Sequence, residues 1–67
     1  MVSYEYELYK DNKFVKYGRN SDRKYIDNLI KYKRRGKRYK LKVTKGDLIL
    51  ENGSYELINR EILFKNY

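Results

Sequence analysis

The sequence contains no cysteine, histidine, proline or tryptophan among its 67 residues. Without cysteine there is no disulfide framework and no thiolate metal ligand, and without histidine the usual zinc ligand sets cannot form. The same two absences exclude catalytic devices of the Ser-His-Asp and Cys-His kinds. We therefore expect no metal and no cofactor. The lack of cysteine also fits a reducing, cytoplasmic location.

Carboxylate pairs are the remaining route to catalysis. Glu5 and Glu7 lie two residues apart, and Glu51 and Glu56 flank a short turn-like segment. The alternating pattern and the turn predict ordinary exposed acids at all four positions. The Thr-Lys-Gly segment at 44–46 lacks the upstream glycines of a phosphate-binding loop. The sequence therefore predicts a protein that is not an enzyme.

Long apolar runs are also missing. The longest are the three-residue segments 48–50 and 62–64, far below the roughly 20 residues that cross a bilayer. The first residues alternate polar and apolar side chains and lack the continuous apolar region of a signal peptide. Although 39% of the residues are charged, the aromatic content and the local periodicities favour a folded chain over a disordered one. We expect one soluble domain over residues 1–67, with no membrane association.

The N-terminal part has the pattern of a β-hairpin. Residues 2–9 alternate in polarity, which predicts a strand with one buried face, and Asp11-Asn12 suits a two-residue turn. This turn predicts four cross-strand pairs, with Leu8–Val15 and Tyr6–Tyr17 inside and Glu7–Lys16 and Tyr9–Phe14 outside. Each predicted pair combines compatible side chains, which supports the register.

A helix is predicted over residues 22–35. Asn20 or Ser21 is expected to cap it, with Asp22 in the first turn and Gly36 just beyond its end. Its apolar side chains form one stripe, made of Tyr25, Ile26, Leu29 and Ile30. The stripe indicates a helix that packs one side on a sheet.

The remaining residues predict further strands. Residues 38–44 alternate strictly, 45–47 are expected to turn, and Asn52-Gly53 between apolar runs favours a type I′ hairpin that pairs Leu48 with Leu57 and Leu50 with Tyr55. The tail, 59–67, fits either a last strand or a short helix. The expected fold is a small α+β domain of order β-β-α-β-β-β, with the last strand uncertain and the helix covering one face of an antiparallel sheet.

Positive charge is concentrated in the middle of the chain. The net charge is +8, and residues 10–45 hold 15 of the 17 Lys and Arg, whereas both ends have more acids than bases. Residues 31–40, KYKRRGKRYK, contain seven cations and no acid. A uniform lysine-rich composition would not produce this asymmetry, so the segment favours a polyanionic partner.

The predicted binding residues come from the helix end and from the outer sheet face. They are Lys33, Arg34, Arg35 and Lys37 near the helix end, with Arg38, Lys40, Lys42, Lys16, Tyr9 and Phe14 on the outer face. Cations beside aromatic rings on a sheet suit phosphate contacts and base stacking. An alternative is that Tyr9 and Phe14 only stabilise the hairpin, and Tyr32 and Tyr39 are expected in the core. The leading hypothesis is a small nucleic-acid-binding protein.

A protein-binding role is the alternative. Such a module would resemble the accessory proteins or inhibitors of phages and mobile elements, and its target would be an acidic protein surface or a nucleoprotein complex. If the alternating tail at 61–64 is an exposed edge strand, it would also allow a homodimer.

Overall fold

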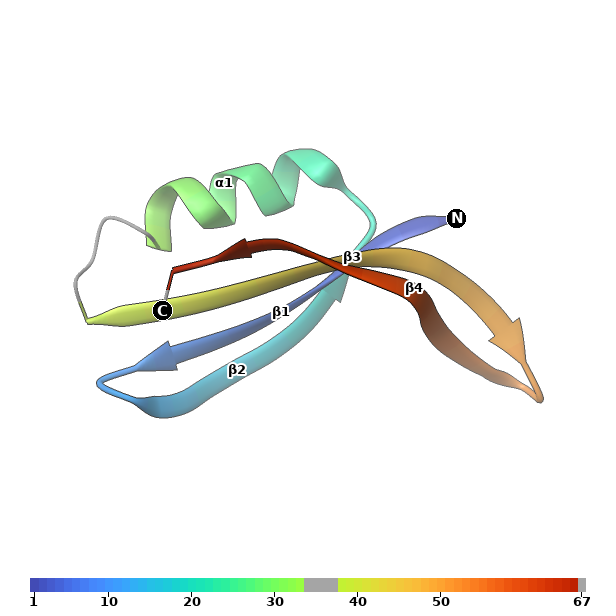
Figure 1. Cartoon of the computed structure of the whole chain (residues 1–67), viewed down its shortest axis with the longest axis horizontal. Coiled ribbons are helices and arrows are strands. Elements are labelled where there is room, and N and C mark those ends of the chain that lie inside the picture. Colours follow the sequence, from blue (N-terminus) through green and yellow to red (C-terminus); the bar gives the residue numbers. More distant parts are fainter. Residues whose placement is uncertain (34–37, 67) are drawn as a thin grey trace.

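The structure, a computed structural model, describes residues 1–33 and 38–66. Its elements are β1 (Val2–Lys10), β2 (Lys13–Asn20), α1 (Arg23–Lys33), β3 (Tyr39–Glu51) and β4 (Ser54–Lys65). The four strands form one antiparallel sheet in the order β2-β1-β3-β4, and α1 runs alongside it (Figure 1). The predicted α+β class, an antiparallel sheet with one helix, is confirmed. Among the described residues no helix is long and apolar enough to span a membrane.

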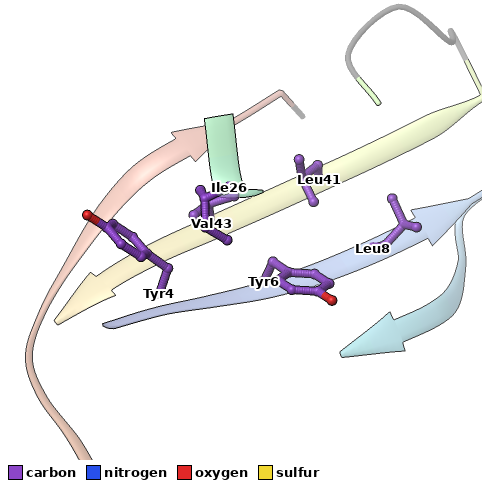
Figure 2. Packing of buried hydrophobic residues seen from close by; sticks show 6 residues of the cluster. All are labelled: Tyr4, Tyr6, Leu8, Ile26, Leu41 and Val43. Carbon is purple, nitrogen blue, oxygen red and sulfur yellow. The ribbon is translucent and has the colours of Figure 1, made fainter. Parts of the chain in front are cut away.

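The core forms where α1 meets the two central strands. Ile26 of α1 is fully buried against the β3 residues Leu41 and Val43, next to Tyr4, Tyr6 and Leu8 of β1 (Figure 2). The strand residues among them are the apolar positions of the predicted alternating patterns, so the inner and outer faces of β1 and β3 are as expected. Full burial of one Ile, Leu or Val side chain contributes about 1.5–3 kcal/mol.

β3 continues through the segment where a turn was predicted. Lys45, Gly46 and Asp47 pair with Tyr4, Ser3 and Val2 of β1, so the prediction of a turn at 45–47 was wrong. Gly46 is needed for close packing, because a Cβ atom there would lie 2.7 Å from the Ile58 carbonyl oxygen and from Leu57 Cγ.

The tail belongs to β4, which confirms the strand alternative for the residues up to Lys65. Asn59 has a φ of 54°, and the pairing register shifts once at Asn59 and Arg60 and once more at Leu63. The tail that was predicted to start at residue 59 is therefore the continuation of one strand that contains two β-bulges. Because β3 is continuous as well, the sheet has four strands, whereas the predicted order has five.

Both predicted hairpin turns are confirmed. Asp11 and Asn12 have φ values of 51° and 64°, and Asn52 and Gly53 have 51° and 78°. Positive φ at both central residues is the property of a type I′ turn. The β3–β4 hairpin also has its predicted register, with Leu48 opposite Leu57 and Leu50 opposite Tyr55.

The register of the first hairpin differs from the prediction beyond its turn. Tyr9 pairs with Phe14 as expected, but Val15 is an extra, bulged residue, so Leu8 faces Lys16 and Tyr6 faces Gly18. The predicted pairs Leu8–Val15, Tyr6–Tyr17 and Glu7–Lys16 were therefore wrong. The ring of Tyr6 occupies the space above Gly18, where a Cβ atom would lie 2.3 Å from the ring carbon Cζ.

The start of α1 is capped by Asp22. Its Oδ1 accepts a hydrogen bond from the Lys24 backbone N–H at 3.0 Å, and Asn20 Oδ1 accepts one from the Asp22 N–H at 2.7 Å. Ser21, one of the two expected caps, instead donates to Ser3 Oγ at 3.2 Å. The helix therefore begins one residue later than predicted, at Arg23. The predicted cap at Gly36 lies outside the described residues.

We expect an alkaline loss of stability that depends on Tyr6. A hydrogen bond with Tyr25, burial and the charge of Tyr25 raise the pKa of Tyr6 from 10.0 to about 12. The folded state thus favours the neutral phenol, and its contribution is present below pH 10 and is lost as the pH rises through about 12. The difference in unfolding free energy between wild type and Tyr6→Phe should therefore shrink over this range.

Urea denaturation at a series of pH values measures this difference. Tyr55→Phe, at the exposed tip of the β3–β4 hairpin, is the matched control for removal of a phenol. A difference between wild type and Tyr6→Phe that stays constant from pH 10 to pH 12 would contradict the assignment.

Candidate nucleic-acid interface

The outer face is the side of the sheet that points away from Ile26 and the core. Alternation and register together place its side chains in three rows across the strands: Phe14–Tyr9–Lys40, Tyr17–Glu7–Lys42–Lys65 and Arg19–Glu5–Thr44–Ile62. Four predicted site residues, Tyr9, Phe14, Lys40 and Lys42, therefore lie together in the first two rows.

The first row is an ordered group of two aromatic rings and a cation. The ring centroids of Tyr9 and Phe14 are 5.8 Å apart at an interplanar angle of 77°, an edge-to-face contact. The Tyr9 hydroxyl donates to Glu7 Oε2 at 3.2 Å, and Lys40 Nζ donates to Asn12 Oδ1. Phe14 is nevertheless 60% exposed, so its ring is both held in place and accessible.

Lys16 does not belong to this group. The bulge at Val15 shifts the register by one residue and sets Lys16 opposite Leu8, whose side chain lies in the core. A shift of one residue moves a side chain to the other face of a sheet. The prediction that Lys16 lies on the outer face was therefore wrong, and Tyr17 lies there instead, opposite Glu7.

Arg38 joins the start of β3 to the first turn. Its Nε and Nη2 atoms each donate to the Asp11 carboxylate at 3.0 Å, and its carbonyl oxygen accepts from the Asp11 N–H at 2.9 Å. Both side chains are well exposed. Arg38 thus lies beside the first turn, and its charge is partly compensated by Asp11.

The helix end lies at the same end of the molecule. Lys33 is the last residue of α1, and in Figure 1 this end of the helix is on the same side as the β1–β2 turn and the start of β3. Arg34, Arg35 and Lys37 lie outside the described residues, so their part in a binding surface stays a prediction.

Three further lysines that the sequence analysis missed lie near these residues. Lys10 and Lys13 face each other beside the first turn, and Lys65 faces Lys42. Lys10 Nζ is also 5.6 Å from the ring centroid of Tyr39. The sequence signal for the Lys10–Lys13 pair was a lysine on each side of the Asp11-Asn12 turn. The Lys42–Lys65 pair could not be predicted, because the bulges of β4 change the register. We call the end of the molecule that carries the following six residues the basic end: Lys10, Lys13, Arg38, Lys40, Lys42 and Lys65.

The middle of the outer face has mixed charge. Arg60 Nη1 donates to Glu5 Oε2 at 2.6 Å, and the Glu5 side chain is only 12% exposed, so the prediction of an ordinary exposed acid was wrong for Glu5. Partial burial and then interaction with Glu5 raise the pKa of Tyr17. A depression of about 170 Å³ lies here, lined by both acids and cations. Glu51 and Glu56 are exposed, as predicted.

The two tyrosines expected in the core differ. Tyr39 is partly buried and packs against the core, whereas Tyr32 is 69% exposed near the end of α1. Tyr32 lies beside Tyr25 and Leu29 at the margin of the apolar stripe and is not part of the core, so its prediction was wrong. Within residues 1–33 and 38–66, no three acidic side chains lie close enough together to hold a metal ion.

Comparison with protein-family models, with curated proteins and with solved structures gives no significant match to this chain. The function is therefore argued from the arrangement of its own side chains.

The two arginine–carboxylate pairs should differ in their effect on stability. Arg38→Gln removes an exposed pair and should lower the unfolding free energy by at most about 1 kcal/mol. Arg60→Gln leaves the nearly buried Glu5 without its strongest partner and should cost about 1–3 kcal/mol. Urea denaturation of both variants at neutral pH measures the difference. A larger loss for Arg38→Gln than for Arg60→Gln would contradict this reading of the two pairs.

Proposed function

We propose that this protein is a non-enzymatic, cytoplasmic nucleic-acid-binding protein that uses the basic end for phosphate contacts. The observation that carries the proposal is that two cross-strand pairs at this end are like-charged, Lys42–Lys65 on the outer face and Lys10–Lys13 on the face that holds the core. Like charges placed directly opposite each other destabilise a sheet. A bound polyanion would offset this cost, because each phosphate supplies the opposite charge.

The charge distribution over the rest of the molecule supports an oriented approach. The β3–β4 hairpin carries Asp47, Glu51 and Glu56, and residues 46–59 contain no Lys or Arg. In Figure 1 the tip of this hairpin lies at the opposite end of the sheet from the β1–β2 turn. A molecule that is basic at one end and acidic at the other turns its basic end toward a polyanion as it approaches.

The chemistry of the basic end favours limited sequence specificity. Five of its six cations are lysines, which act as flexible point charges and not as planar bidentate donors. Arg38 already directs two of its N–H groups at Asp11. Sequence is read mainly by fixed donors and acceptors at base edges, whereas phosphate contacts determine position and affinity.

We expect binding that falls steeply with salt and depends on the lysines of β3. The logarithm of affinity should fall linearly with the logarithm of salt concentration, with a slope of about −0.7 to −0.9 per neutralised phosphate. The variant Lys40→Gln with Lys42→Gln should reduce the size of this slope by about 1.4 to 1.8. Fluorescence anisotropy with a labelled oligonucleotide at several salt concentrations measures both quantities.

The control is Lys24→Gln with Lys45→Gln, which removes the same charge from outside the basic end. It should leave the slope close to that of wild type. Equal effects of the two double variants would show that net charge alone governs binding, and binding independent of salt would contradict the proposal. Changing Arg34, Arg35 and Lys37 to Gln tests their predicted contribution in the same assay.

A second candidate function is a protein-binding module, such as an inhibitor of a larger protein or nucleoprotein complex. It is favoured by β4, which is an edge strand that carries the exposed Ile62, and by the hairpin tip, where Leu50 and Tyr55 are exposed. An edge strand offers unpaired backbone groups to another chain, including a second copy. The two candidates are separated by measuring mass in solution over a range of concentrations, with and without nuclease treatment. A dimer that persists after nuclease treatment and is lost in Ile62→Lys supports the second candidate.

A further inference from the structure

The outer face separates aromatic rings from cations. Phe14, Tyr9 and Tyr17 lie on β2 and β1, whereas Lys40, Lys42 and Lys65 lie on β3 and β4 in the same two rows. On this one face, the rings of each row therefore lie toward the β2 edge of the sheet and the ammonium groups toward the β4 edge. A polymer that has a flat apolar part on one side and a charged backbone on the other matches this arrangement.

Phe14 and Tyr17 are suited to contact flat groups from solution. They are 60% and 49% exposed, and neither lies under α1, because both are on the outer face. The edge-to-face contact with Tyr9 orients Phe14, and Tyr17 lies opposite Glu7 in the next row. Rings that are already oriented lose little conformational entropy when a base stacks on them.

The spacing of the two rings distinguishes single-stranded from double-stranded nucleic acid. Their partners on β1, Tyr9 and Glu7, are two residues apart, so the rows are about 7 Å apart along the strand. Bases in a duplex are about 3.4 Å apart and their faces are covered by stacked neighbours. Successive bases can therefore reach both rings only when the strand is unpaired and unstacked.

The position of Glu7 also favours a ligand with its bases over β1 and β2 and its phosphates over β3 and β4. It lies between Tyr17 and Lys42 in the second row, and it accepts a hydrogen bond from the Tyr9 hydroxyl. A carboxylate repels phosphate but accepts hydrogen bonds from the amino groups of bases. It therefore disfavours a backbone over β1 and directs the phosphates toward the lysines of β3 and β4.

We infer that the ligand of this surface is single-stranded nucleic acid, with bases stacked on Phe14 and Tyr17 and its backbone along Lys40, Lys42 and Lys65. This inference rests on the proposed function and adds the form of the polymer to it. Stacking on aromatic side chains tolerates any base, which agrees with the limited specificity expected of the lysines.

The test compares three probes of equal length: a labelled single-stranded oligonucleotide, its duplex, and an abasic strand that keeps the phosphates but has no bases. The variant is Phe14→Leu with Tyr17→Leu, and the control is Tyr32→Leu, which removes an exposed ring from α1. Wild type should bind the single strand more tightly than the duplex or the abasic strand. The double variant, which loses two stacked bases, should lose about 30- to 10⁴-fold in affinity for the single strand, with an unchanged salt slope.

The abasic strand keeps the result interpretable if the substitutions also weaken the hairpin. Loss of the rings should matter only when bases are present, so the variant and wild type should bind the abasic strand equally. Wild type that binds all three probes equally, with a normal salt slope, would overturn the stacking inference and leave the phosphate-binding function standing. Absence of salt-dependent binding to every probe would overturn the proposed function as well.

Discussion

The close packing of the Tyr6 ring over Gly18 determines which side chains of β2 reach the outer face. The ring fills the space that a Cβ atom at position 18 would need, and its hydroxyl lies 3.4 Å from that of Tyr25 on α1. The Tyr6 side chain therefore connects β1 with both β2 and α1. Pairing Tyr6 with Gly18 requires an extra residue between the turn and this point, and Val15 is that residue. The bulge places Tyr17 on the outer face and Lys16 on the other, whereas Phe14 lies before the bulge and is placed by the turn.

Local features of the fold were predictable, and features that depend on distant contacts were not. The alternation in residues 2–9, the Asn52-Gly53 turn and the apolar stripe containing Ile26 follow from neighbours in the sequence, and all three are confirmed. The bulge at Val15 depends on the packing of Tyr6, seen only when three elements come together. The role of Gly46 also depends on distant contacts. A glycine beside Lys and Asp predicts a turn from the local sequence, whereas in the structure it leaves space for Leu57 and the Ile58 carbonyl.

The candidate site was predictable in composition and only partly in extent. Strict alternation placed Lys40 and Lys42 on the outer face, and the turn paired Tyr9 with Phe14. Lys65 could not be placed, because two bulges in β4 change the register between the hairpin turn and the C-terminal residues. The number of cations at one end of the sheet is thus larger than the central segment of the sequence indicated.

The acids of the outer face limit where a polyanion can bind. Glu5 is held by Arg60, a residue from the other end of the chain, so the acid of the third row already has a cationic partner. The first row has no acid, and the second has Glu7 beside Lys42 and Lys65. A phosphate therefore meets a carboxylate in the second and third rows and none in the first, which lies next to the β1–β2 turn and holds Phe14 and Lys40. Because the first row combines rings and a cation without an acid, electrostatic attraction and stacking both favour a strand that lies toward this end of the sheet.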